Sequence, residues 1–323
     1  MKIAFISQPE YFRAHYSIDI ACATEVKEFI FNFTMSKDDF KELVKFNADI
    51  NIFFRGEFFP TTVLEKLNGI KIAISSEPFP NYIQDKLNYT NDSFNRFFTF
   101  EQIRPLKFDY VFHYDKSSLK FLKEQNINLS GDFTLPVDTE IYKKENLKKD
   151  WDIFFIGRST PYREIFLGSL KHYNNILHIA HGVYGKGLVE YCNKSKIVLN
   201  LHAENEVSWE PRVQMLMATG SFLMSHKITP NDILIPNVDY VEVDMYNTMD
   251  LYEKVQFYLK NNSARKKIAN SGYQKIQKYF HAKSNFENLI QDILHDKYVK
   301  FNANEKRSNF YFRKFLVKLD KFL

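Results

Sequence analysis

The sequence predicts an α/β protein built from two doubly wound domains, and three observations lead to this prediction. Short apolar runs alternate with helical patterns, which is typical of parallel sheets whose strands are joined by helices. The runs are rich in Ile, Val and Phe with little polar alternation, as expected for strands covered on both faces. A charged, proline-containing segment at 135–151 interrupts the alternation, which then restarts. With 323 residues the chain is long enough for two cores.

The first half supplies four predicted strands and at least two helices. The helix predicted at 36–46 begins with Ser36, a residue that caps helices, and acidic residues follow in its first turn. A second helix is predicted at 115–126. The strands predicted here are 2–7, 50–54, 70–75 and 109–114.

The second half repeats the pattern, and we place the domain boundary near 146–150, within the last part of the charged segment. The predicted strands are 152–157, 176–180, 196–202, 221–225 and 240–244. The predicted helices are 161–172, 185–194, 211–219, 248–261 and 263–279. The predicted division is a first domain at 1–147, a second at 148–280 and a closing helix with a basic amphipathic tail at 281–323. Because open parallel sheets bind ligands at the carboxyl ends of their strands, each strand-to-helix loop is a candidate site.

Composition excludes several classes of protein. Cys22 and Cys192 lie too far apart in the chain for a CxxC pair, which argues against a disulfide framework or a structural zinc site. The nine histidines form no HExxH motif, so no metal is expected. No window approaches ~20 consecutive apolar residues, and the first apolar run is too short for a signal peptide, so we expect a cytoplasmic protein. The net charge of +5 is modest for a nucleic-acid binder.

The segment SWEPRVQMLMATGSFLMS at 208–225 is the first candidate site. Pro211 suits the first position of a helix and Gly220 suits its end. The helix should therefore start at the carboxyl edge of the sheet, with free amides at Arg212 and Val213. Amides, a helix dipole and a guanidinium together predict an anion site.

Two neighbouring side chains extend this prediction. Trp209 offers a flat face for a base or a sugar. The alternative is structural: Glu210 offsets the dipole of a capped helix, and Arg212 is solvated.

The same stretch resembles a family. IVLNLH…WEPRVQMLMATGSFLMS resembles the donor-binding segment of GT-B glycosyltransferases, in particular the group-1-like branch that includes spore-maturation-protein homologues. The likeness extends over roughly 108–290 and includes LPVD with Asp138, DIFFIGRSTPYRE, and Phe280-His281. It also includes a signature formed by Arg265, Ile268, Ala269 and Gly272. The resemblance implies two Rossmann-like domains with a cleft between them, and sugar transfer from a nucleotide sugar without cofactor or required metal, as in polysaccharide biosynthesis.

One position departs from the family pattern. Members often carry a Glu five residues before the glycine that ends the helix, where the resemblance implies a contact with the donor ribose hydroxyls. Met215 stands at that position here. Glu210, five residues earlier, is either a substitute or a plain cap.

Cations are expected to hold the donor phosphates. The resemblance places Arg158, in an F-x-G-R motif, at a phosphate-binding position, and a planar guanidinium can pair with two oxygens at once. Arg163 and Lys186 are further candidates. Arg163 has the alternative of a surface pair with Glu164 or Asp152, and Lys186 that of a solvated side chain. The glycine-rich GVYGKG around Lys186 matches neither GxxxxGK[ST] nor GxGxxG.

The first domain should supply the acceptor site and any base. Glu57, Glu77 and His113 each follow a predicted strand and are the candidates. An inverting transfer needs a base to deprotonate the acceptor hydroxyl, whereas a retaining one depends on stabilising the leaving phosphate. The structural alternatives are that Glu77 caps the turn before Pro78, that His113 is a core histidine, and that Glu57 likewise has no catalytic role.

The sequence thus predicts a cytoplasmic, metal-independent glycosyltransferase that moves a sugar from a nucleotide-sugar donor to a glycan, lipid-linked or protein acceptor. The basic, aromatic tail at 297–323 either lies peripherally on the inner face of the membrane or packs on the first domain or in a dimer. Two alternatives stay open: a non-catalytic nucleotide- or sugar-binding protein of the same fold, and a nucleic-acid-binding α/β protein.

Overall fold

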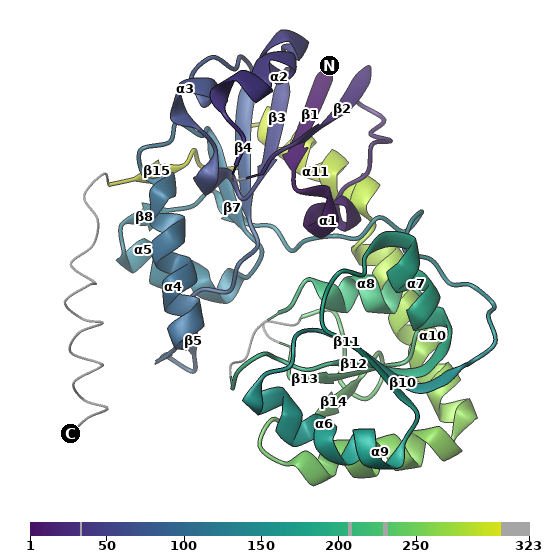
Figure 1. Cartoon of the computed structure of the whole chain (residues 1–323). Helices are drawn as coiled ribbons and strands as arrows, with labels where there is room; N and C mark the ends of the chain where they lie inside the picture. The colour runs from purple at the N-terminus through teal and green to yellow at the C-terminus, as the bar shows by residue number, and fades with distance from the viewer. Residues whose placement is uncertain (33, 206–208, 229–231, 305–323) are drawn as a thin grey trace, which may run out of the picture. The chain divides into compact units, whose positions relative to one another are not determined.

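The computed structural model describes residues 1–32, 34–205, 209–228 and 232–304 and contains two compact units (Figure 1). Among the described residues, the first unit is formed by 1–7, 23–133 and 292–304. The second is formed by 8–22 and 134–291. The segment at 134–147, placed in the first domain from the sequence, makes its contacts in the second unit. Asp138 donates its amide to the Ala14 carbonyl (2.7 Å), and the Tyr142 hydroxyl accepts from the Gly185 amide (3.0 Å).

The first unit is built on a six-stranded parallel sheet in the order β2-β1-β3-β4-β7-β9. Three of the four predicted strands have the predicted bounds, and the fourth is shorter by one residue at each end. The strands are β1 (Lys2–Ser7), β2 (Glu25–Ile30), β3 (Ile50–Phe54), β4 (Ile70–Ser75), β7 (Tyr110–His113) and β9 (Gly131–Asp132). Sequence analysis missed β2, because this edge strand has no fully buried residue and its sequence, EVKEFI, is no apolar run.

The remaining elements of the first unit cover this sheet. The predicted Ser36 cap is confirmed: its side chain accepts from the Asp38 amide, and Asp39 accepts from the Ser36 amide. The core between the sheet and the helices is rich in phenylalanine, for example Phe53 and Phe59, whose ring centroids are 4.7 Å apart. The elements are η2 (Lys37–Phe40), α2 (Lys41–Phe46), η3 (Gly56–Phe58), α3 (Thr61–Leu64), β5 (Asn81–Ile83), β6 (Lys86–Asn88), α4 (Asn91–Phe100), η4 (Glu101–Ile103), η5 (Lys116–Ser118), α5 (Leu119–Glu124), β8 (Ile127–Asn128) and β15 (Asn302–Ala303).

The second unit has a five-stranded parallel sheet in the order β11-β10-β12-β13-β14. All five strands and all five helices predicted for this half are present, with ends that shift by up to two residues. The strands are β10 (Trp151–Ile156), β11 (Ile176–Ile179), β12 (Ser195–Asn200), β13 (Leu223–His226) and β14 (Val241–Val243). The helices are α1 (Pro9–Phe12), η1 (Arg13–His15), α6 (Pro161–Tyr173), α7 (Gly185–Asn193), α8 (Arg212–Ala218), α9 (Thr248–Lys260), α10 (Asn262–Tyr279) and α11 (Ala282–Leu294).

Both sheets follow the same doubly wound order, in which the first strand lies between the second and the third. The connection after the first strand therefore leads to the strand on one side, and the connection after the second strand returns to the strand on the other side. In such sheets the loops that follow the first and the third strands diverge at their carboxyl ends and leave a crevice that binds ligands. In the second unit this switch point lies between β10 and β12.

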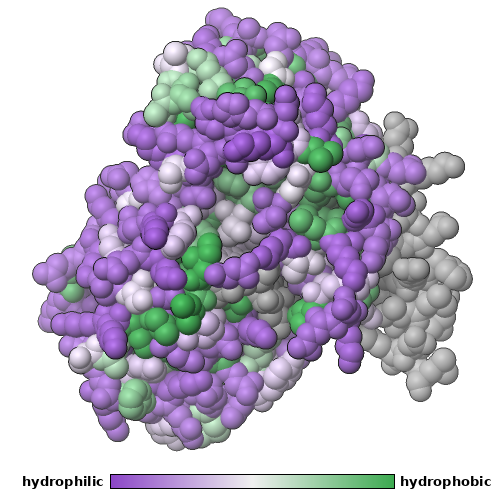
Figure 2. All heavy atoms as spheres, turned by 180° about the vertical axis from the view of Figure 1, so that it is seen from behind, coloured by the Kyte–Doolittle hydropathy of each residue, from purple (hydrophilic) through white to green (hydrophobic). Residues whose placement is uncertain are grey.

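The chain after α11 returns to the first unit. β15 pairs antiparallel with β8, and the Phe301 amide donates to the Asp109 carbonyl (2.9 Å). The apolar positions of the predicted amphipathic tail, Phe312, Phe315, Leu316 and Leu319, lie outside the described residues. Across the ranges that the structure describes, no helix combines the length and the apolar character needed to span a membrane. The space-filling view in Figure 2 shows a mainly hydrophilic face with small hydrophobic patches.

Close packing of α10 against α8 depends on Gly272. A Cβ added at this position would lie 2.3 Å from the Asp239 carbonyl oxygen and 2.4 Å from Cε of Met217. Gly168, in the middle of α6, is the opposite case, because a Cβ there would meet no heavy atom within 4 Å.

These two glycines make a matched pair. We expect Gly272→Ala to lower the free energy of unfolding by about 1–3 kcal/mol, because overpacking outweighs the gain in helix propensity. Gly168→Ala should raise it by about 0.5–1 kcal/mol. Urea denaturation followed by tryptophan fluorescence measures both effects, since Trp151 and Trp209 belong to the second unit. Equal stabilities of the two variants would contradict this account.

Candidate functional site

The candidate site lies at the switch point of the second sheet, on the two loops that follow β10 and β12 (Figure 1). Gly157 and Arg158 come directly after β10, and Arg212 opens α8 after the loop that follows β12. Arg212 joins the two loops, because its Nη1 donates to the Ile156 carbonyl (2.5 Å). Arg158 and Arg212, both predicted from the sequence, thus lie on two connected loops at the carboxyl edge of the sheet.

Glu210 orients the Arg212 guanidinium. Oε2 of Glu210 accepts from Nε of Arg212 at 2.9 Å and also from Nη2. Burial by itself would raise the pKa of Glu210, but the charges of Arg212, His202 and Arg163 outweigh it and hold this pKa below its usual value. Glu210 is therefore an ionised partner that fixes the fork of Arg212.

Gly157 allows two guanidinium groups to approach the backbone. Its φ is +150°, a value that residues with a side chain rarely adopt. A Cβ at this position would lie 3.0 Å from Nη1 of Arg212 and 3.1 Å from Nη1 of Arg163. The F-x-G-R motif contains this glycine, but the motif alone did not predict its role. Its role is to leave room for the two guanidinium groups beside the backbone.

Arg163 and Arg158 have different surroundings. Arg163 is 3% exposed, donates through Nε and Nη2 to the Leu201 carbonyl (3.0 and 2.8 Å) and through Nη1 to the Arg158 carbonyl (3.0 Å). Arg163 is therefore buried and not on the surface, and it fixes the two loops from within. The Arg158 side chain is exposed and forms no hydrogen bond or ion pair with the residues that the structure describes. Its guanidinium is therefore available to a ligand.

Two expectations for the start of α8 need correction. The Val213 amide is not free, because it donates to the Glu210 carbonyl (3.0 Å). The reason is that Pro211 adopts αR geometry before the helix, which closes a turn on Glu210. Trp209 is 4% exposed and packs on Phe280 with ring centroids 5.7 Å apart, so its face is occupied by the protein. The Val213 amide and the Trp209 ring are therefore both engaged within the protein.

Lys186 lies in the first turn of α7, which follows the neighbouring strand β11. Its side chain is exposed and has no hydrogen bond or ion pair within the described part of the chain. Within the described residues, no hydrogen bond or ion pair joins Lys186 to Arg158 or Arg212. Its position therefore fits the alternative of a solvated side chain.

The two glutamates predicted as bases lie in a network of charges in the first unit. Arg55 pairs with Glu57 (Nε to Oε1, 2.6 Å) and also with Glu77, which in turn pairs with Arg96. Arg55 holds a left-handed conformation, with φ of 61°, which is uncommon for a residue with a side chain. Burial raises the pKa of Glu57, although the charge of Arg55 opposes this. Glu77 is 16% exposed in its side chain, against 2% for Glu57.

His113 lies at the end of β7 and is fully buried. Its ring stacks on Phe79 with centroids 4.6 Å apart and an interplanar angle of 12°. Burial lowers the pKa of His113 to about 3, so the ring is neutral near pH 7. These surroundings are those of the core histidine that the sequence left open as an alternative.

Two buried histidines, His202 and His226, form a hydrogen-bonded pair for which the sequence predicted no role. The backbone amide of His202 donates to Nδ1 of His226 (3.2 Å), and both side chains are fully buried. The charge of His202 contributes to the low pKa of Glu210. The N-L-H ending of the predicted strand, at 200–202, is the sequence feature that could have pointed to this histidine.

Residues 145–291, just under half of the chain, match a protein-family model described as glycosyl transferase-like. All the residues of the site around Arg158 and Arg212 lie within this matched segment. A search of curated proteins finds no match to this sequence.

Solved structures extend the likeness to the whole chain. An alpha-glucosyltransferase in complex with UDP-glucose and DNA containing an abasic site has a TM-score of 0.60 at 12% identity, covering 91% of this chain and 99% of that one. Sucrose-phosphate synthase of Thermosynechococcus elongatus has a TM-score of 0.58 at 10% identity, with 92% and 100% covered. HepE of Anabaena, in complex with UDP and glucose, has a TM-score of 0.57 at 10% identity, with 92% and 100% covered. These likenesses confirm the predicted GT-B fold.

Proposed function

We propose that this protein transfers a sugar from a nucleoside-diphosphate sugar to a hydroxyl group of a glycan, lipid-linked or protein acceptor. The observation that supports this most is that Arg158 and Arg212 both lie at the switch point of the second sheet, inside the segment 145–291 that matches the glycosyl transferase-like family model. Two of the similar structures are complexes, one with UDP-glucose and one with UDP and glucose, and they favour the same class of donor. The motifs of the second half favour the spore-maturation-protein-like branch of the group.

The chemistry assigned to these residues is stabilisation of the leaving diphosphate. Negative charge develops on the phosphate as the bond to the sugar breaks, and preorganised guanidinium groups lower the energy of that state. Arg212 is preorganised by Glu210 and the Ile156 carbonyl, and the exposed Arg158 completes the cationic surface. These cations would take the part that a metal ion plays in other enzymes, so the proposed reaction needs no metal.

The surroundings of the three base candidates favour a reaction that depends mainly on this leaving group. His113 is buried in the core, and Glu57 is nearly inaccessible. Glu77 reaches the surface, but two guanidinium groups hold it, and cations lower the basicity of a carboxylate. We therefore assign Glu77 a secondary role. A further part of the proposal is a cytoplasmic location.

A screen of nucleoside diphosphates by thermal shift tests the proposal. A ligand at 100 times its Kd should add ~2.7 kcal/mol of stability, and Arg158→Ala should remove most of this effect. Lys196→Ala is the matched control, because Lys196 pairs with Asp152 near the amino end of the same sheet. No shift with any nucleoside diphosphate would contradict the proposal.

Turnover separates the proposal from its alternatives. Donor hydrolysis, measured with and without acceptor, should be detectable for a transferase and absent for a non-catalytic binding protein. A nucleic-acid-binding protein would instead bind oligonucleotides with a steep dependence on salt.

A further inference from the structure

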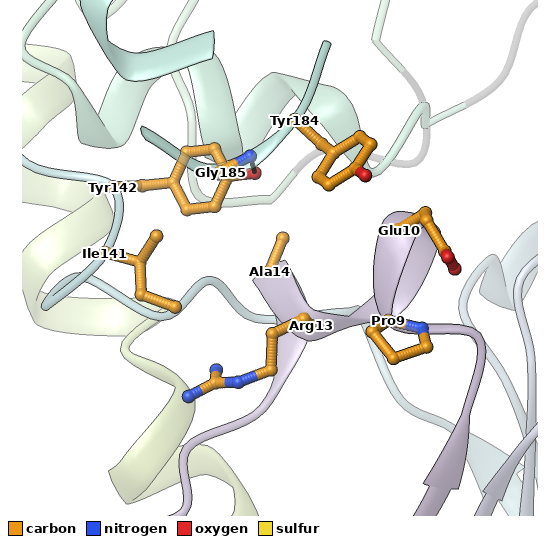
Figure 3. Close-up of a pocket in the computed structure, with 8 residues that line it drawn as sticks. All are labelled: Pro9, Glu10, Arg13, Ala14, Ile141, Tyr142, Tyr184 and Gly185. Carbon is orange, nitrogen blue, oxygen red and sulfur yellow. Dashed lines mark hydrogen bonds between the residues drawn. The ribbon is translucent and has the colours of Figure 1, made fainter. Parts of the chain in front are cut away.

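A cavity lies in the second unit, and its lining includes neither Arg158 nor Arg212. Its volume is about 200 Å³. It is lined by α1 and η1, by the segment that follows Asp138, and by the start of α7 (Figure 3). The lining residues are Pro9, Glu10, Arg13, Ala14, Ile141, Tyr142, Tyr184 and Gly185.

The walls of the cavity are apolar and partly aromatic. Figure 3 shows the rings of Tyr142 and Tyr184 on one side and Pro9 and Ala14 on the other. Tyr142 is 2% exposed and its hydroxyl accepts from the Gly185 amide (3.0 Å), so its ring is a fixed wall. Tyr184 is 53% exposed, which leaves its ring available at the mouth. A Cβ added to Gly185 would meet no heavy atom within 4 Å, so this wall leaves space beside it.

The polar groups at the cavity carry both charges. Arg13 donates through Nη1 to Asp138 (2.8 Å) and to the Tyr16 carbonyl (2.9 Å), and its side chain remains 26% exposed. Glu10 is exposed and makes no hydrogen bond or ion pair with any residue in the described ranges. Arg13 is thus a hydrogen-bond donor fixed by its partners, and Glu10 is a carboxylate that can accept two hydrogen bonds.

Size and chemistry together select the ligand. At roughly 30 Å³ per water molecule, the cavity equals the space of about seven waters, enough for one six-membered ring with its substituents. A phosphate would be repelled by Glu10, and a purely apolar ligand would leave both charges unused. A sugar ring offers apolar C–H faces to aromatic and aliphatic walls and hydroxyl groups to a carboxylate and a guanidinium.

We propose that this cavity binds one sugar ring of the acceptor, which makes the acceptor a glycan or a glycan-bearing molecule. The inference rests on the proposed transferase function and narrows its acceptor class. Tyr184 packs on the ring, and Glu10 accepts hydrogen bonds from its hydroxyl groups.

Saturation-transfer difference NMR on the full chain tests this with methyl α-glucoside, methyl β-galactoside and N-acetylglucosamine as probes. At least one probe should bind saturably. Tyr184→Ala and, independently, Glu10→Gln should raise its Kd about tenfold or more, because each removes a principal contact. Both side chains are exposed, so neither variant should impair folding. Tyr173→Ala is the matched control, since Tyr173 is 66% exposed at the end of α6 and should leave binding unchanged.

Three results would overturn the inference: no saturable binding of any probe, binding that both variants leave unchanged, or uridine binding that Tyr184→Ala abolishes, which would assign the cavity to a base. The nucleoside-diphosphate shift, measured on the same samples, keeps the two proposals separate. If that shift persists while sugar binding is absent, only the acceptor subsite fails. If the shift is absent while a sugar binds at Tyr184, the donor site and the proposed transferase fail instead.

Discussion

Arg212→Ala is expected to weaken binding of the nucleoside diphosphate roughly 100-fold, which corresponds to about 2.8 kcal/mol. Arg212 connects the loops after β10 and β12 through the Ile156 carbonyl and presents a fork that Glu210 orients. Without it the ligand loses a cation, and the carboxylate of Glu210 remains as a repulsive charge. Transfer should fall by at least the same factor, because the interaction is stronger in the transition state. Isothermal titration calorimetry measures the affinity, and a donor-consumption assay measures the rate.

Three further variants sharpen this test. Arg212→Lys keeps the charge but loses the planar fork, so it should recover only part of the affinity. Glu77→Gln should keep the rate within about tenfold of the native protein, since the proposed chemistry does not depend on a strong base. Lys196→Ala, near the amino end of the sheet, should change neither quantity. Full activity in Arg212→Ala, or a larger loss in Glu77→Gln, would contradict the assignment.

Arg104→Ala should lower the free energy of unfolding of the first unit by about 3–5 kcal/mol. The side chains of Arg104 and Glu101 are 1% and 0% exposed and pair at 2.8 Å. Arg104 also donates to the carbonyls of Gln125 (2.9 Å) and Asn304 (3.0 Å), so it ties η4 to the segments at β8 and β15. Removing it leaves a buried carboxylate and two carbonyls without their donor, and a buried charge without a partner is strongly destabilising.

Urea denaturation followed by circular dichroism measures this loss. Tryptophan fluorescence in the same samples reports on the second unit, which contains Trp151 and Trp209. Lys107→Ala is the matched control, because Lys107 pairs with Glu65 at 3.9 Å with both side chains largely exposed, and such pairs contribute about 0–1 kcal/mol. An unchanged circular-dichroism midpoint for Arg104→Ala would refute the estimate.

The central strands of both sheets could be predicted from the sequence because burial on two faces demands continuous apolar runs. β3, whose five residues are all buried, is the clearest case. The edge strand β2 could not be predicted in this way, because four of its residues are exposed and the other two are only half-buried. The assignment of 8–22 and 134–147 to the second unit also escaped prediction, since it depends on bonds such as that from Asp138 to Ala14 between segments distant in sequence.

The sequence by itself determined most of the strands and helices, although not β2, and the glycosyltransferase resemblance that makes Arg158 a candidate, since these follow from local apolar patterns and short motifs. Only the tertiary structure decided which of the candidate residues are exposed. Arg163, Trp209 and His113 were candidates beside Arg158, yet each is buried against partners that come from other segments. Burial depends on how distant parts of the chain pack, and no local pattern carries that information.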